Sequence, residues 1–226
     1  MSAKQKSTNV KKQPAAAKKR TALIAVCAAL VLCLAGTGIV LLNGSRTQTA
    51  ADAETALLSG TYYVAIDIQD YGTITAELYA DIAPVTVTNF LKLANQGFYN
   101  GLTFHRIISG FMIQGGDPNG NGTGGSSETI KGEFSANGVA NSLSHERGVL
   151  SMARSSAYNS ASSQFFIMHQ TATYLDGNYA AFGRVLSGME IVDAICANTP
   201  VTDSNGTVSR ADQPVITAIR QIEKPE

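Results

Sequence analysis

Residues Phe104–Asp117 read FHRIISGFMIQGGD, an apolar and aromatic run that contains one arginine and one glutamine. Read as strands, Phe104, Arg106 and Ile108 share one face, and Met112 and Gln114 share a face after the break at Gly110. An arginine is always charged, so it is not expected in such a run unless it has a partner or a function. The run therefore predicts an apolar surface with one fixed cation and one amide, which suits an apolar group attached to an amide, such as a prolyl peptide.

Short strands surround this run. Residues 62–68 and 73–78 alternate between apolar and polar side chains, and the short link Asp70-Tyr71-Gly72 predicts a hairpin. Helices are expected from Pro84 to about Gly97 and over 188–197. Further strand-like runs lie at 103–108, 111–115, 148–153, 164–168, 180–186 and 214–222. Many short strands, two helices and no βαβ alternation predict an all-β-dominated fold, a closed antiparallel β-barrel with helical caps.

The charge of the chain is unevenly distributed. Seven of the seventeen Lys and Arg residues lie in the first twenty positions, where there is no acid. The remainder holds ten bases against seventeen acids, a formal charge of −7. An acidic domain is a poor candidate for binding a phosphate backbone, so we expect no nucleic-acid partner.

Residues 21–42, TALIAVCAALVLCLAGTGIVLL, carry no charge and are long enough for a helix across the ~30 Å hydrocarbon core of a bilayer. The lysines before them predict a cytoplasmic N-terminus. We therefore expect a basic cytoplasmic tail (1–20), a transmembrane helix as membrane anchor (21–42), a flexible linker (43–60) and an extracytoplasmic domain (61–226). The alternative is a cleaved signal segment and a secreted domain, since Ala51-Asp52-Ala53 resembles a small-residue cleavage site.

Four motifs in the domain carry a resemblance. They are Phe104–Asp117, Ser151–Arg154, Ser163–Ile167, and Leu175–Gly177 followed by Ala181–Val185. In this order they resemble the cyclophilin family of peptidyl-prolyl isomerases, over roughly Thr61 to Glu226. The resemblance implies a closed eight-stranded antiparallel β-barrel capped by two α-helices. It also implies a monomeric domain without cofactor or metal, acting on proline-containing polypeptides.

The chemistry of that family explains the residue types. Rotation about an X-Pro bond crosses a barrier of ~18–20 kcal/mol, and in the twisted state the prolyl nitrogen regains its lone pair. A guanidinium aimed at that nitrogen binds the twisted amide better than the planar one. The resemblance gives this catalytic role to Arg106. It implies that the substrate-binding residues are Phe104, His105, Phe111, Met112, Gln114, Ala153, Arg154, Phe166, Tyr174, Leu175 and Tyr179, with at most an accessory role for His105.

Three positions depart from the best-known pattern of the family. Tyr174 stands where many members have tryptophan, Tyr179 where many have histidine, and Arg154 replaces an asparagine. All three lie at the rim of the pocket by analogy. Without the indole N–H donor, we do not extend cyclosporin-type inhibitor binding to this chain.

Other interpretations stay open at this point. An isolated apolar residue such as Phe111 or Leu175 is more often plain core, and only the joint match favours a pocket. His145 and His169 have no nucleophile or ligand spacing, so we interpret them as surface or core residues. A peptide-binding module or holdase that uses the same groove without turnover is the alternative function.

Residues 117–128, DPNGNGTGGSSE, satisfy a calcium-loop pattern, D-x-N-x-N-G-x5-E. The run before them predicts a strand rather than a helix, and Gly124 occupies a position that is usually apolar. We therefore interpret this segment as a glycine-rich loop beside the active site, with calcium binding as a minor alternative.

Overall fold

The computed structural model describes residues 56–226. The predicted tail (1–20), the apolar segment (21–42) and most of the predicted linker lie outside these residues. Within residues 56–226, no helix combines the length and the apolar character needed to cross a membrane.

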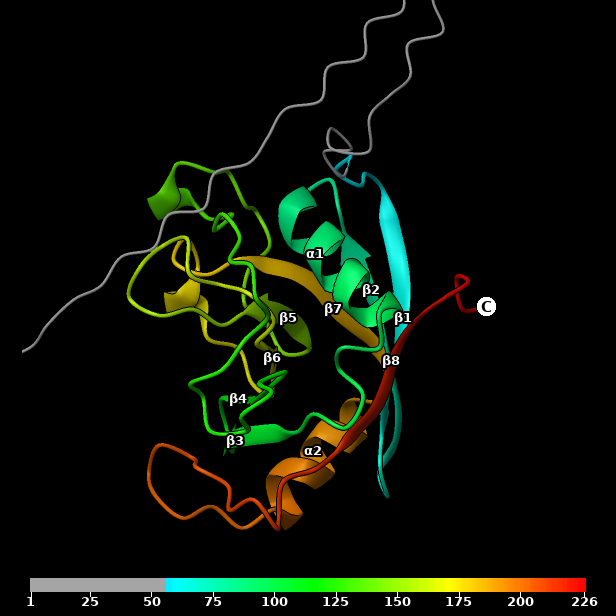
Figure 1. The fold of residues 1–226 in the computed structure, drawn as a ribbon, viewed down its shortest axis with the longest axis vertical. Coiled ribbons are helices and arrows are strands. Elements are labelled where there is room, and N and C mark those ends of the chain that lie inside the picture. The colour runs from blue at the N-terminus through cyan, green and yellow to red at the C-terminus, as the bar shows by residue number, and fades with distance from the viewer. Residues whose placement is uncertain (1–55) are drawn as a thin grey trace, which may run out of the picture. The chain divides into compact units, whose positions relative to one another are not determined.

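Eight strands form one sheet in which all neighbours are antiparallel (Figure 1). They are β1 (Thr61–Ile68), β2 (Gly72–Tyr79), β3 (Phe104–Ile108), β4 (Met112–Gly115), β5 (Val149–Met152), β6 (Phe165–Met168), β7 (Ala181–Ser187) and β8 (Ile216–Ile222). Their order is β3-β4-β6-β5-β7-β2-β1-β8. The predictions of an antiparallel, mainly β fold and of the hairpin of β1 and β2 are confirmed.

The two outer strands, β3 and β8, meet only around their first residues. Thr103 and Val215 form an isolated bridge, and the backbone N–H of Phe104 donates to Pro214 O at 2.9 Å. No ladder between β3 and β8 is present in the described part of the chain. The sheet is a half-barrel, and the closed ring that the sequence predicted is not confirmed.

Two helices pack on the sheet, as predicted. Helix α1 (Pro84–Asn95) begins with proline at its first turn, where the missing N–H costs nothing, and contacts β8 and β2. Helix α2 (Met189–Asn198) contacts β2. Phe90 of α1 is fully buried, with its ring centroid 5.4 Å from that of Phe165 and 5.1 Å from that of Phe182. These rings join α1 to β6 and β7 in one core.

Strand β3 carries a bulge that changes which residues face the core. The register with β4 shifts between Phe104 and Arg106, so His105 is an extra residue. A single extra residue reverses the alternation of a strand. Phe104 and Ile107 are therefore both buried in the core, whereas Arg106 is only partly buried. The prediction that Phe104 shares a face with Arg106 is wrong for this reason.

The segment that satisfies a calcium-loop pattern is organised by its own backbone. The carboxylate of Asp117 accepts hydrogen bonds from the N–H groups of Asn119 (2.8 Å) and Gly122 (2.6 Å). Burial opposes ionisation of Asp117, but these backbone donors hold its pKa below the usual range. Within residues 56–226, no three His, Cys, Asp or Glu side chains gather into a metal site. The geometry fits the interpretation as a glycine-rich loop.

Candidate active site

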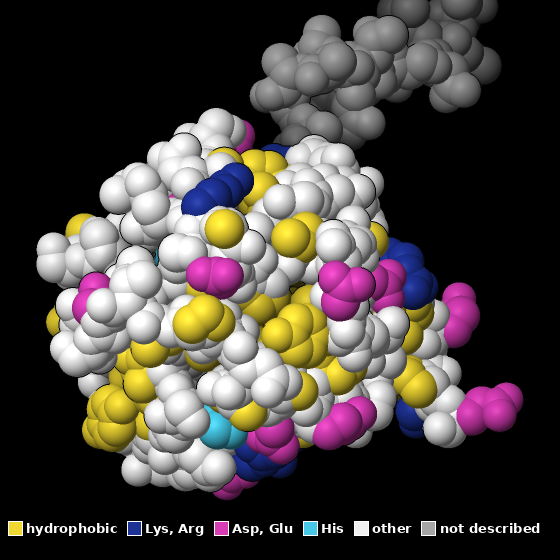
Figure 2. Space-filling model, turned by 90° about the horizontal axis from the view of Figure 1, so that it is seen from below, with side chains coloured by type: hydrophobic (Ala, Val, Ile, Leu, Met, Phe, Trp, Pro, Cys, Tyr) yellow, Lys and Arg dark blue, Asp and Glu magenta, His cyan; other side chains and the backbone are white. Residues whose placement is uncertain are grey.

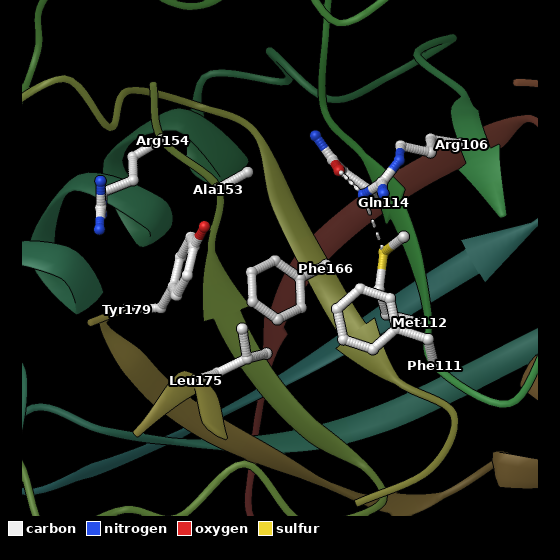
Figure 3. A pocket seen from close by; sticks show the side chains of 9 residues that line it. All are labelled: Arg106, Phe111, Met112, Gln114, Ala153, Arg154, Phe166, Leu175 and Tyr179. Atoms are coloured by element: carbon white, nitrogen blue, oxygen red, sulfur yellow. Dashed lines mark hydrogen bonds between the residues drawn. The ribbon is translucent and has the colours of Figure 1, made fainter. Parts of the chain in front are cut away.

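A pocket of about 220 Å³ gathers residues from strands β3, β4 and β6 and from the segments that connect the strands (Figure 3). Its lining residues are Arg106, Phe111, Met112, Gln114, Ala153, Arg154, Phe166, Leu175 and Tyr179. All nine are among the residues expected from the sequence. Positions up to 73 residues apart in the chain therefore line one hollow.

The pocket wall is apolar and tightly packed. Met112 and Phe166 lie on the neighbouring strands β4 and β6, and Leu175 ends the short 3-10 helix η2 (Thr173–Leu175). All three are buried. The ring of Phe166 meets that of Tyr179 edge-on, with centroids 6.0 Å apart, and stacks on the imidazole of His145 at 6.1 Å. An apolar hollow with walls fixed in this way suits a pyrrolidine ring.

Arg106 places its charge at one side of this hollow. Its Nη1 donates to Gln114 Oε1 at 3.1 Å, and its Nε donates to the backbone oxygen of Asn205 at 2.8 Å. Gln114 in turn donates to Gln164 Oε1 at 2.9 Å. No described Asp or Glu lies within 4.0 Å of the guanidinium. The guanidinium is thus aimed by neutral groups, and its charge is available to a ligand.

Three expected site residues lie outside this pocket. Phe104 is fully buried, so the prediction that it contacts substrate is wrong, and the bulge in β3 is the cause. His105 is 4% exposed and lines a different hollow next to the 117–122 loop, so it does not touch the prolyl pocket. Tyr174 is 71% exposed and stacks on Phe111 at 6.1 Å, which puts it at the rim.

The sequence profile of the family described as cyclophilin type peptidyl-prolyl cis-trans isomerase/CLD matches residues 63–221. The chain belongs to the cyclophilin family. Peptidyl-prolyl cis-trans isomerase B of Bacillus subtilis (strain 168) is 50% identical over 123 residues, which cover 54% of this chain and 82% of that protein. Peptidyl-prolyl cis-trans isomerase-like 1 of Aspergillus oryzae is 42% identical over 156 residues, covering 69% and 92%.

Similarity to solved structures supports the same family. A cyclophilin type peptidyl-prolyl cis-trans isomerase of Cryptosporidium parvum superposes with a TM-score of 0.65 at 32% identity, covering 74% of this chain and all of that one. A second structure of that protein, solved in the presence of the dipeptide Ala-Pro, superposes with a TM-score of 0.63 at 34% identity, covering 72% and 99%. The activity of this cyclophilin is peptidyl-prolyl cis-trans isomerisation.

The loop that anchors Arg106 in this cyclophilin is held by one carboxylate. Asp203 accepts hydrogen bonds from the backbone N–H groups of Asn205 (2.9 Å) and Thr207 (3.1 Å) and from Thr207 Oγ1 (2.9 Å). The bonds from Thr207 lower the pKa of Asp203 most. The sequence analysis did not single out this loop, although Asp-Ser-Asn-Gly is a turn signature that could have marked it.

A buried polar chain lies behind the floor of the pocket. His145 Nδ1 is 2.7 Å from Asp176 Oδ1, and its Nε2 is 2.9 Å from Ser151 Oγ. The order Ser-His-Asp suggests a nucleophile, but Ser151 is fully buried and no substrate reaches it. Burial lowers the pKa of His145 despite the opposing effect of Asp176. The neutral imidazole therefore supports the Phe166 ring.

A second histidine fixes the turn between β3 and β4. His169 Nδ1 accepts from the backbone N–H of Gly110 at 2.8 Å, and its Nε2 lies 3.1 Å from Asp193 Oδ1 on α2. The backbone N–H of His169 also donates to Phe111 O at 2.9 Å. Phe111, which lines the pocket, is thus connected to α2 through His169.

Proposed function

We propose that this cyclophilin turns over X-Pro bonds in exported polypeptides, with Arg106 as the residue that stabilises the twisted amide. The observation that carries the assignment is the guanidinium of Arg106, which faces an apolar hollow and has no described carboxylate beside it. A cation in this position meets the developing lone pair of the prolyl nitrogen.

The reaction needs no bond cleavage and no proton transfer. Phe166, Met112 and Leu175 hold the proline ring while the preceding carbonyl swings around the C–N axis. A planar amide delocalises its nitrogen lone pair, so Arg106 interacts more strongly with the twisted form. Every 1.4 kcal/mol or so of such selective binding raises the rate about tenfold.

The substrates are proline-containing polypeptides. Support comes from the Cryptosporidium parvum relative that was solved in the presence of Ala-Pro, and from the match between hollow and ring described above. Gln114 reaches the same hollow with an amide, which suits hydrogen bonding to a peptide backbone. The domain works as a monomer in this proposal.

The extracytoplasmic part of the proposal rests on sequence alone. The basic residues 1–20 and the uncharged segment 21–42 support an N-terminus in the cytoplasm and a domain outside the membrane. Protease added to intact cells, after permeabilisation of any outer layer, tests this orientation. We expect the domain to be degraded and an epitope tag at the N-terminus to be protected. A domain protected until the inner membrane is broken contradicts the orientation.

The activity test uses the full chain in detergent micelles and a test peptide with one X-Pro bond. We expect fast isomerisation by the unmodified protein and strong loss in Arg106→Ala. Arg220→Ala is the control, because Arg220 pairs with Asp67 at 3.0 Å and lines no part of the pocket. Peptide binding without turnover in the unmodified protein favours the holdase alternative instead.

A further inference from the structure

The described arginines fall into two groups. Arg147, Arg184 and Arg220 each pair with a carboxylate, at 2.8, 2.8 and 3.0 Å. On the face shown in Figure 2, several basic side chains likewise adjoin acidic ones. The remaining arginines of residues 56–226 are Arg106, Arg154 and Arg210, and none of them has a described Asp or Glu within 4.0 Å.

These three arginines line adjoining hollows. Arg106 lines the prolyl pocket and a neighbouring hollow of about 520 Å³, which Arg210 also lines. Arg154 lines the prolyl pocket and a hollow of about 240 Å³ on another side. Gln114 lines all three. The hollows therefore form one groove that continues past the proline site in two directions.

The charge of this groove is opposite to that of the domain. No Asp, Glu or Lys lines any of its three hollows. Residues 21–226 nevertheless carry a formal charge of −7. All fully ionised side chains along the groove are thus cations, in a domain with an excess of acids, and an anionic group on a ligand is the complementary partner.

The guanidinium of Arg210 is the most available of the three. Arg106 is held by Asn205 O and Gln114, and Arg154 lies 4.7 Å from the ring centroid of Tyr179 while its Nε donates to a backbone carbonyl. Arg210 is exposed, and its one described hydrogen bond is a 3.3 Å contact from Nη1 to Asn119 O. Most of its five N–H donors can therefore meet a ligand.

The inner wall of the same hollow also has unsatisfied polar atoms. Both ring nitrogens of His105 are buried without a hydrogen-bond partner among the described residues. His105 lines this hollow together with Asn121, whose side-chain amide adds a neutral donor. A hollow with an exposed guanidinium at its edge, a second guanidinium beside it and a neutral amide donor is suited to a carboxylate.

We propose that the hollow lined by Arg106, Arg210 and His105 binds an acidic side chain of the substrate. The preferred substrates are then proline-containing polypeptides with Asp or Glu close to the proline. This proposal rests on the proposed function and names the substrate class of the same groove. An exposed ion pair changes affinity by roughly two- to fivefold, so the preference is graded rather than absolute.

The test uses the full chain in detergent and a set of peptides of one length that contain a single proline. One residue, one to three positions before or after the proline, is Glu, Gln or Lys. We expect kcat/KM at low ionic strength to rank Glu above Gln above Lys at positions on one side, with about two- to fivefold per step. About 0.5 M salt should reduce the ranking, because it shortens the screening length to a few ångströms.

Three variants show which residue causes the preference. Arg210→Gln should bring the Glu-to-Lys ratio towards one. Lys131→Gln removes the same charge from an exposed residue that lines none of the three hollows, so it should leave the ratio unchanged. Arg210→Lys keeps the charge and should retain most of the preference.

Other results separate the two proposals. Equal rates with Glu, Gln and Lys peptides, or equal loss of the ratio in both Gln variants, overturn the acidic subsite and leave the isomerase intact. If no peptide is turned over, the ranking is read from binding by fluorescence anisotropy. Tighter binding of the Glu peptide that depends on Arg210 supports the subsite and overturns the isomerase, whereas binding without a ranking overturns both.

Discussion

Arg106 donates from Nε to the backbone oxygen of Asn205, 99 residues later in the chain, at 2.8 Å. The isolated bridge between Arg106 and Thr207 and the 2.8 Å bond from Ile107 N to Gly206 O fasten the backbone of β3 to the same loop. The direction of the guanidinium is therefore a property of the 203–207 loop as much as of β3.

Arg106→Lys tests geometry against charge. Lysine keeps the cation but has no Nε–H to donate to Asn205 O and no planar fork to share with Gln114. We expect kcat to fall roughly 10²–10³-fold, the range seen when one oriented transition-state donor is lost. Circular dichroism and the unfolding midpoint should stay near those of the unmodified protein. Full activity in this variant contradicts the need for an oriented guanidinium.

Asp203→Ala removes the acceptor that closes the anchoring loop. We expect kcat to fall while KM changes little, because Asp203 acts on Arg106 only indirectly, through Asn205 and Thr207, and Arg106 acts on the twisted state. Since the folded-state pKa of Asp203 is lowered, its contribution is present above the ordinary value of 3.8 and is lost as the pH falls below it. Asp212→Ala, which removes an exposed carboxylate bonded to Ser209, is the matched control. Equal loss of kcat in both variants refutes the link.

Gly206→Ala probes the same loop through its backbone. A Cβ on Gly206 would lie 2.2 Å from Ile107 O, and its φ of +79° disfavours any side chain. Gly138 has a similar φ of +73° and no atom within 4 Å of its Cβ position. We expect Gly138→Ala to cost about 1–2 kcal/mol of unfolding free energy for the left-handed conformation alone. Gly206→Ala should cost clearly more in urea unfolding, and equal costs would show that the close contact is tolerated.

The buried imidazoles of His105 and His145 should make the free energy of unfolding depend on pH. Burial is the main cause that lowers the pKa of each below its ordinary value of 6.5. Below that pH the unfolded chain takes up protons that the folded protein does not, so stability is full above about 6.5 and falls as the pH decreases towards the folded-state pKa. The slope is at most about 1.4 kcal/mol per pH unit for each imidazole.

His105→Leu tests one of these two contributions. The variant replaces a buried ring that has no described partner with an apolar group, so stability at pH 7 should change little or rise. The slope of unfolding free energy between pH 5 and 7 should decrease. Lys131→Gln serves as a control that keeps the slope, and an unchanged slope in His105→Leu would mean that this imidazole titrates normally.

The contributions of the two ring contacts of His169 can be separated by two substitutions. In His169→Asn the amide oxygen lies near the place of Nδ1 and can still accept from Gly110, whereas in His169→Gln the amide nitrogen lies near the place of Nε2 and can still donate to Asp193. We expect KM for an X-Pro peptide to rise more in His169→Gln, because the turn before Phe111 is released. The opposite order would assign the larger effect to the contact with α2.

Sequence reasoning located the pocket because its residues lie within short local motifs. The alternation in β1 and β2 and the proline at the start of α1 are also local signals, and they predicted those elements correctly. The bulge at His105 carries no such signal, since the five residues FHRII do not show by themselves which one has no partner on β4. The result was a wrong face for Phe104, and His105 lies in the neighbouring hollow rather than in the prolyl pocket.

The supporting contacts lay beyond this kind of reasoning. The bond between Arg106 and Asn205 and the pair of His145 and Asp176, 31 residues apart, depend on how distant segments meet. Closure of the sheet has the same character, because strand runs alone do not show whether β3 and β8 join. Such contacts follow from the tertiary fold and not from periodicity.

The pairing of β1 with β8 has a consequence for how the protein is made. Thr61 opens the first strand and Ile222 closes the last, and Tyr63 faces Ile222 across the ladder. At ~5–20 residues per second, a ribosome needs roughly ten to thirty seconds to advance from one to the other. During that interval one edge of β1 has no strand to pair with, and an unpaired edge invites association with other chains. A protein that speeds a slow folding step in other polypeptides thus completes its own sheet only after a delay that the rate of translation sets.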